Sequence, residues 1–169
     1  AIYAENVVYD VNASLRRAIS LTLEDNTVFS NNDRAIAICD TRIAIGDNAI
    51  FSGNRDDTEK DGGGAIWCRN GGIIIGDNAL FSGNYVDMDS RDSWGGVFLD
   101  DMGGSTITVG ENAIFIGNYV SSNSGCATGG VMWVRKYGLY DNVKDTGAIS
   151  MGANATFLSL IHISEPTRP

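Results

Sequence analysis

Hydrophobic and polar positions along the chain follow one twelve-residue pattern, which reads IIIGDNALFSGN at residues 73–84. Apolar residues alternate at its start, a polar Gly-Asp-Asn stretch follows, and a second apolar stretch ends on Gly-Asn. A period of two is typical of a β-strand with one buried face, and Gly, Asp and Asn favour turns. The pattern therefore predicts a strand, a turn, a second strand and a second turn.

Three further complete copies and one partial copy keep the same internal spacing. The complete copies lie at residues 21–32, 43–54 and 107–118, and the partial copy spans residues 149–157. Self-similarity of this kind is considered before local propensity, because it is the signature of repeat architectures. The chain is therefore predicted to stack one structural unit several times.

A second motif, Gly-Gly-[Ala/Val]-apolar, precedes three of the copies and begins at Gly63, Gly95 and Gly129. Before the copy at residues 43–54, Asp33 and Arg34 stand where the two glycines are expected. Residues 1–3 (AIY) match the motif without its glycines. We therefore expect the sequence to begin inside a coil of the repeat.

The spacing between copies predicts the fold. The separation of equivalent phenylalanines grows from 22 residues (Phe29 to Phe51) to 42 residues (Phe115 to Phe157), so the extra residues are expected outside a fixed core. We predict an all-β fold, a right-handed parallel β-helix of about five coils with pectin-lyase-like architecture. An antiparallel meander of hairpins is the alternative. A leucine-rich repeat fits less well, because its L-x-x-L-x-L core is missing.

Copies stacked about 4.8 Å apart would bring equivalent side chains into columns. Offset stacking of rings adds about 0.5 to 1.5 kcal/mol per pair beyond burial. Asparagine tolerates the positive φ of a turn, and its amide can bond to the next copy. Segments 55–62, 85–94 and 119–128 are expected as loops at one corner, and the insertion 136–146 at another edge. The predicted columns are Phe29, Phe51, Phe81, Phe115 and Phe157, and Asn32, Asn54, Asn84 and Asn118.

The last twelve residues, 158–169 (LSLIHISEPTRP), break the pattern where Ser-Gly-Asn is due after Phe157. They contain both prolines and the only histidine, and they resemble the translation of a transposase adapter used in short-read library preparation. We therefore expect this tail to be non-native and leave it out of the functional argument. Residues 1–157 are expected to be a fragment of a longer β-helix, truncated at both ends.

Composition excludes several classes of function. A formal net charge of −9 argues against nucleic acid and against anionic membrane surfaces as partners. No apolar run approaches the length of a transmembrane helix, and no signal-peptide pattern is present. With His162 in the tail set aside, Ser-His-Asp and Cys-His catalysis and histidine-containing zinc sites have no candidates. Cys39, Cys68 and Cys126 show no C-x-x-C spacing, which favours isolated thiols over a disulfide.

Aligning the Gly-Gly motifs yields one candidate binding strip. Its residues are Trp67, Leu99 and Trp133 in one column and Arg69, Asp101 and Arg135 in the next. One interpretation is structural, with ion pairs between coils, each contributing under about 1 kcal/mol, beneath an apolar strip that a loop covers. The other is a strip of aromatic and charged residues that contacts a glycan or a protein.

Carboxylates also permit metal or enzyme hypotheses. The acidic residues of segments 55–62 and 85–94 suit Ca²⁺, but no EF-hand or G-G-x-G-x-D spacing is present, so solvated charge is favoured. A hydrolase would use a carboxylate pair such as Asp100 and Asp101. A lyase would use Arg69 or Arg135 near Asp100. Both signals are weak, and we predict no catalytic residues, no metal and no cofactor.

The pairing of GGAI at residues 63–66 with FSGN at residues 81–84 resembles the polymorphic outer membrane protein repeat of chlamydial autotransporters. The Phe-x-x-Asn segments at residues 29–32, 51–54 and 115–118 match it too. The resemblance covers residues 1–157, although Asp33 and Arg34 depart from it. It implies a secreted, surface-displayed β-helical passenger that mediates adhesion at the cell surface or outer membrane.

The resemblance also implies the partners, which are a surface protein or glycan of a host or neighbouring cell and the remaining coils of the same solenoid. Non-catalytic adhesion or partner binding is therefore the predicted function. Two alternatives stay open: a fragment of a polysaccharide lyase or hydrolase, and a structural spacer that displays another domain.

Overall fold

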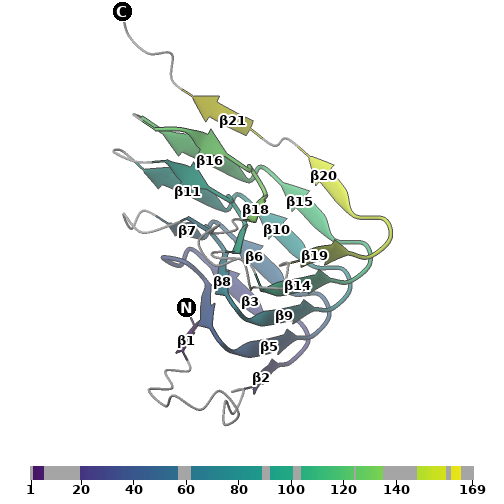
Figure 1. Cartoon of the computed structure of the whole chain (residues 1–169). Coiled ribbons are helices and arrows are strands. Elements are labelled where there is room, and N and C mark those ends of the chain that lie inside the picture. The colour runs from purple at the N-terminus through teal and green to yellow at the C-terminus, as the bar shows by residue number, and fades with distance from the viewer. Residues whose placement is uncertain are drawn as a thin grey trace, which may run out of the picture.

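The computed structural model describes residues 2–5, 20–56, 62–88, 92–100, 104–123, 125–134, 148–158 and 161–164. Within these ranges the regular elements are all β-strands, and the strands pair in parallel. Equivalent strands lie side by side in stacked sheets (Figure 1). This confirms the all-β class and is compatible with a β-helix or solenoid. It excludes the antiparallel meander for the described residues.

Four sheets carry the fold, and we number them I to IV in the order in which the chain visits them. Sheet I contains β1 (Ile2–Glu5), β4 (Ile36–Cys39), β8 (Ile66–Arg69), β13 (Phe98–Asp100) and β18 (Met132–Val134). Sheet II contains β2 (Ser20–Leu23), β5 (Arg42–Ile45), β9 (Gly72–Ile75), β14 (Thr106–Val109) and β19 (Ala148–Met151). Sheet III contains β3 (Val28–Ser30), β6 (Ile50–Ser52), β10 (Leu80–Ser82), β15 (Ile114–Ile116) and β20 (Thr156–Leu158). Sheet IV contains β7 (Arg55–Asp56), β11 (Tyr85–Met88), β16 (Tyr119–Ser122) and β21 (Ile161–Ser164), and β12 (Ser93–Trp94) pairs with β17 (Ala127–Thr128).

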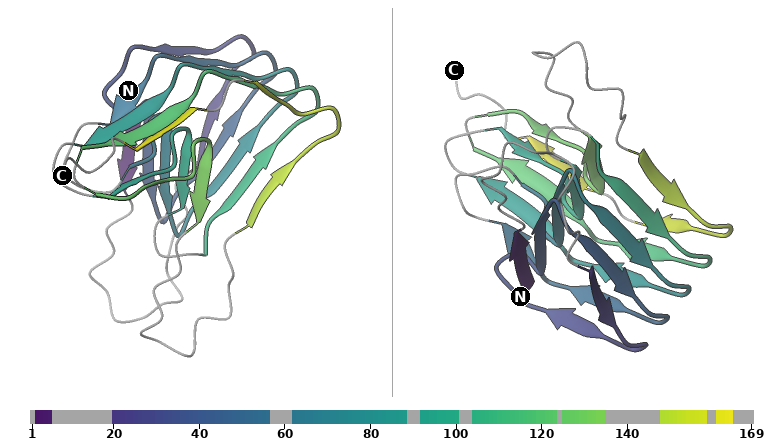
Figure 2. Two further views of the ribbon diagram at one scale, coloured as in Figure 1. Left: turned by 90° about the horizontal axis from the view of Figure 1, so that it is seen from above. Right: turned by 60° about the horizontal axis from the view of Figure 1, so that its bottom comes forward.

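Each twelve-residue copy supplies one strand to sheet II and one to sheet III, and each copy pairs in register with the next. Ile43 lies opposite Ile73, which lies opposite Ile107. The turned views in Figure 2 show the copies stacked, with the turns between sheets II and III aligned. Alternation along each strand then places one set of side chains inside and the other outside.

The interior is filled by columns of identical or similar apolar side chains. Ile43, Ile73 and Ile107 are at most 2% exposed. The phenylalanines of sheet III stack with centroid separations of 4.9 Å (Phe29 to Phe51), 4.9 Å (Phe51 to Phe81), 4.7 Å (Phe81 to Phe115) and 4.8 Å (Phe115 to Phe157). Phe157, the last ring of the stack, is 42% exposed, whereas the others are buried.

A ladder of asparagine amides lies beside this aromatic stack and is equally buried. The Asn84 amide donates to Oδ1 of Asn118 at 2.9 Å and to the carbonyl of Phe51 at 2.9 Å. Its own Oδ1 accepts from the amide of Asn54 at 2.9 Å and from the Asn54 backbone N–H at 3.1 Å. All four hydrogen-bonding positions of this side chain are therefore used. Asn32 donates to Asn54 in the same way and is partly exposed.

The expected bond from each amide to the next copy is confirmed, whereas the expected positive φ is wrong for these asparagines, because it falls on the preceding residue. Asn31, Gly53, Gly83 and Gly117 have φ between 54° and 62°. Five asparagines with positive φ form a second, exposed ladder at the turn between sheets II and III. These are Asn26, Asn48, Asn78, Asn112 and Asn154, with φ between 57° and 61°.

Contacts between successive Gly-Asp-Asn turns explain why glycine and an acidic residue occur at these positions. Oδ1 of Asp47 accepts the backbone N–H of Asp77 at 2.8 Å, so the acidic residue ties each turn to the next one. A Cβ added at Gly76 would lie 2.2 Å from Oδ1 of Asp47 and 2.8 Å from a Gly46 backbone atom. Glycine is therefore required here because two backbones approach closely, and no positive φ is involved.

The expected loops after the Phe-x-x-Asn segments are in part strands. Segments 55–62, 85–94 and 119–128 begin with β7, β11 and β16, which build sheet IV, and β12 and β17 lie in the last two of these segments. Val86 and Val120 are fully buried, so these strands alternate like the others. The alternation is short, because β7 has only two residues and β11 has four. The charged residues of these segments indicate loops by composition, so the strands were not predicted. The insertion 136–146 lies outside the described residues.

The two copies whose Gly-Gly motif lacks its glycines still pair in register with the copies that have them. Ile2 lies opposite Ile36, which lies opposite Ile66, so residues 1–3 do match the motif. At the other end, Leu158 closes β20, and β21 at residues 161–164 pairs with β16. The proposed non-native origin of residues 158–169 stays a prediction from the sequence.

Replacing Asn84 by alanine is expected to destabilise the protein strongly. The substitution leaves the Asn54 N–H and one hydrogen of the Asn54 amide unpaired in a buried site and removes the hydrogen bond to the Phe51 carbonyl, at about 1–3 kcal/mol for each group. Urea unfolding should show a loss of at least about 3 kcal/mol. Asn78→Gly is the control, because glycine keeps the positive φ of the exposed ladder and water replaces the amide. Equal losses for the two variants would contradict a special role for the buried ladder.

Gly76→Ala is expected to lower the free energy of unfolding by about 1–3 kcal/mol, because the new methyl group meets backbone atoms of the preceding turn. Gly72→Ala is the matched control. A Cβ there has ordinary contacts, 3.4 Å to Cγ of Arg42 and 3.5 Å to Oγ1 of Thr106. Thermal unfolding of both variants is the measurement, and an unchanged melting temperature for Gly76→Ala would show that the turns are not packed as described.

Candidate functional site

The aromatic column predicted from the Gly-Gly motif lies on sheet I. Trp67, Leu99 and Trp133 are register partners on β8, β13 and β18. Leu99 is only 1% exposed, and both tryptophans are partly buried. The column is therefore much less accessible than a binding strip should be.

The charged column of the same strip is described only in part. Arg69 is partly exposed and lies opposite Cys39. Asp101 and Arg135 lie outside the described residues, so their role and the ion pairs between coils stay predictions. The structure thus places Trp67 and Trp133 in one column with Leu99 between them, and the strip formed with Arg69, Asp101 and Arg135 stays a prediction.

Trp67 has a structural partner in Arg34, the residue that replaces a glycine of the motif. The Arg34 guanidinium lies 5.7 Å from the Trp67 ring centroid and donates to the Gly62 carbonyl at 3.2 Å. It also pairs with Asp56, whose side chain is fully buried. Asp56 occupies the register position that Val86 fills in the next copy. A buried ion pair thus replaces an apolar contact in this copy.

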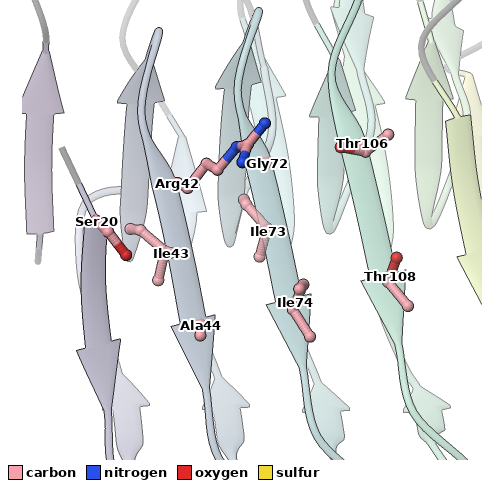
Figure 3. Close-up of a pocket in the computed structure, with 9 residues that line it drawn as sticks. All are labelled: Ser20, Arg42, Ile43, Ala44, Gly72, Ile73, Ile74, Thr106 and Thr108. Carbon is pink, nitrogen blue, oxygen red and sulfur yellow. The ribbon is translucent and has the colours of Figure 1, made fainter. Parts of the chain in front are cut away.

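The outer face of sheet II carries a shallow groove of about 420 Å³ (Figure 3). It crosses β2, β5, β9 and β14 and is built from outward-facing side chains at two register levels. One level holds Ser20, Arg42, Gly72 and Thr106, and the other holds Ala44, Ile74 and Thr108. Because consecutive strands are held in register by the ladders beneath, these side chains project from a rigid surface.

The groove exists because its middle residues are small. Gly72 has no side chain, and Arg42 extends across the sheet above it, as Figure 3 shows. Ala44 leaves a similar gap beside Ile74. Ile74 itself is 60% exposed. The groove therefore offers one apolar side chain, one guanidinium and hydroxyl groups from Thr106 and Thr108, which suits a ligand with an apolar group next to an anionic or hydrogen-bonding one.

Sequence reasoning did not identify this groove, although a signal was present. Strict alternation predicts a polar residue between Ile73 and Ile75, and the chain has Ile74 instead. An apolar residue on an outward position of a half-buried strand marks an exposed contact surface. The candidate strip was predicted from residues aligned on the Gly-Gly motifs, and those residues lie on sheet I.

No group of three or more His, Cys, Asp or Glu side chains converges on a point among the described residues. Asp100, the candidate hydrolase carboxylate, lies in the inward column with Ile38 and Cys68 and is 1% exposed. A polysaccharide on the outside of the sheet would not reach it.

Cys68 is buried in the same column, and burial raises its pKa to about 12, with the nearby Asp100 adding to the rise and a hydrogen bond from Ser105 opposing it. A thiol in this state is a poor nucleophile. None of the three cysteines, all of which lie in the described residues, forms a disulfide, and Cys126 is exposed whereas Cys39 is partly exposed.

In the folded protein, the exposed Cys126 should react with thiol reagents before the buried Cys68. At pH 8 only about one Cys68 in ten thousand is ionised, so a maleimide should modify Cys126 first and Cys68 only after unfolding. The unfolded chain releases the Cys68 proton near its ordinary pKa of 9.0 whereas the folded chain retains it, so stability should fall as pH rises from 9.0 towards 12. Peptide mapping by mass spectrometry checks the labelling, and labelling of Cys68 as fast as Cys126 would contradict the burial.

Comparisons of the chain with protein-family models, curated proteins and solved structures find no match. Among the described residues there is no helix with the length and apolar character needed to cross a membrane.

Proposed function

We propose that this chain is a segment of an extracellular, surface-displayed parallel β-helix that binds a partner without catalysis. The helix is right-handed, has about five coils and resembles the pectin-lyase architecture. Handedness is supported by a general rule, since parallel strands in one sheet are joined by right-handed crossovers in about 98% of cases. Surface display and adhesion are supported by the resemblance of the two motifs to the polymorphic outer membrane protein repeat.

The observation that carries this proposal is the groove on the outer face of sheet II. Ile74 is 60% exposed at its centre, and Gly72 and Ala44 keep the space around it open. The proposed occupant is an extended segment of a surface protein on a host or neighbouring cell. It would place an apolar side chain on Ile74 and a carboxylate near Arg42.

The rigidity of the face supports binding over the spacer alternative. A spacer needs a continuous core but has no need of a hollow with an exposed isoleucine on its outer face. The buried position of Asp100 and the inert Cys68 disfavour the enzyme alternative.

The test measures adhesion of fluorescent beads coated with the purified chain to cultured epithelial cells and to bacterial cells, by flow cytometry. Ile74→Asp removes the apolar contact and places a carboxylate beside the partner's own. Gly72→Ala fills the floor of the groove with no cost to the fold. Each change should reduce bead binding at least about fivefold, which corresponds to about 1 kcal/mol.

Ile114→Asp is the matched control, because Ile114 is also exposed (41%) but lies on the outer face of sheet III. It should bind like the wild type. If the three variants bind equally well, the groove is not the adhesive surface, and the spacer function is favoured. In a separate assay, treatment of the cells with protease or with glycosidases before the beads are added shows whether the partner is a protein or a glycan.

A further inference from the structure

Sheet IV, whose strands were predicted as loops, carries two stacked tyrosines on its outer face. Tyr85 and Tyr119 are register partners on β11 and β16, and their ring centroids are 4.9 Å apart with an interplanar angle of 4°. Both are partly buried, and they alternate with the fully buried Val86 and Val120. The rings therefore project outward as a short aromatic column.

A second hollow of about 350 Å³ adjoins this column. It is open to the surface and is lined by Asn31, Asp33, Gly53, Arg55 and Tyr85, which come from three successive copies of the repeat. Tyr119 covers one face of the Tyr85 ring. The face of Tyr85 that reaches the hollow is hence the opposite one, on the side of β7, where Arg55 is its register partner.

The backbone around the hollow is held on every level. Arg55 donates its N–H to the Asn32 carbonyl at 3.0 Å and accepts from the Arg34 N–H at 2.7 Å, and Tyr85 donates to the Asn54 carbonyl at 2.9 Å. Gly53 at the floor has a φ of 60°, a conformation that favours glycine. The hollow is thus pre-formed, which lowers the entropy cost of binding.

Its chemistry indicates the class of ligand. An exposed aromatic face accepts the C–H face of a sugar ring, and planar amide, carboxylate and guanidinium groups form paired hydrogen bonds with adjacent hydroxyls. The one carboxylate, Asp33, and the one guanidinium, Arg55, balance in charge. The hollow lies near the lower end of the range of about 300–1,000 Å³ for ligand sites, which suits one or two sugar units.

We propose that this hollow, the Tyr85 site, binds a neutral pyranose unit of a glycan, stacked on the free face of Tyr85 and hydrogen-bonded to Asn31, Asp33 and Arg55. Tyr119 is a positioning residue that stacks on the other face of the Tyr85 ring and so holds it in place. The site lies on sheet IV, whereas the groove for the proposed protein partner lies on sheet II. It stands on separate observations and does not depend on the proposed adhesion function.

The test titrates the full chain with cellohexaose, mannohexaose and N-acetylchitohexaose, and with hexagalacturonate as the acidic counterpart, by calorimetry. At least one neutral hexasaccharide should bind, and hexagalacturonate should bind at least about tenfold more weakly. Tyr85→Ala should weaken binding at least about tenfold, the scale of 1.4 kcal/mol, whereas Tyr85→Phe keeps the ring and should stay within about threefold. Saturation-transfer NMR should show contact between the sugar protons and the tyrosine rings in the wild type.

Two further variants keep the outcome clear. Asp33→Ala, on an exposed side chain outside the aromatic column, should weaken binding at least about fivefold while the melting temperature stays unchanged, which guards against misfolding of Tyr85→Ala. Ile74→Asp should bind the sugar like the wild type, so failure of the protein groove and failure of this site are distinguishable. The proposal is overturned if no neutral hexasaccharide binds, if Tyr85→Ala and Asp33→Ala both bind like the wild type, or if hexagalacturonate binds more tightly.

Discussion

The buried amide ladder formed by Asn54, Asn84 and Asn118 is the interaction on which the rest of this structure depends. Each amide is fully hydrogen-bonded only when an asparagine lies one strand spacing away on both sides. A slip of one residue between copies would leave several buried polar groups unpaired, at about 1–3 kcal/mol each, and would also turn the apolar face outward. Hydrophobic columns alone would tolerate such slips better. The ladder thus fixes the register, and the register places every outward-facing residue.

Because the inward-facing side chains fix the register, the outward-facing side chains are able to differ from copy to copy. The first inward position of sheet II is isoleucine in three successive copies, whereas the outward position just before it changes from Arg42 to Gly72 to Thr106. A small residue next to a large one then produces a hollow, and neither the core nor the turns change. Both candidate sites arise in this way. Each combines side chains from several copies, so neither is visible within a single repeat.

These relations explain how much the sequence could predict. The parallel all-β fold follows from copies of constant length, and the columns of Phe81 and Asn84 follow from their fixed positions within the copy. Sheet IV was missed because β7 and β11 are short and carry Arg55, Asp56 and Asp87, which indicate a loop by composition. The candidate sites were missed because they depend on which residues become neighbours across copies. That depends on register between strands 22 or more residues apart, which no local pattern contains.

The copy that departs most from the repeat shows how far the scaffold can be changed. Arg34 stands where a glycine is expected and has a φ of 48°, and Asp56 stands where later copies have valine. Either change alone would be costly, because one would leave a partly buried guanidinium and the other a fully buried carboxylate without its counter-charge. Together they form an ion pair, and the guanidinium also lies over Trp67. The Asp33–Arg34 substitution that weakens the sequence motif is therefore a compensated exchange of apolar packing for a polar contact. The Arg34–Asp56 pair directly follows Asp33 and Arg55 of the Tyr85 site in the sequence, so the most divergent copy is also the one that brings charged side chains to that face of the molecule.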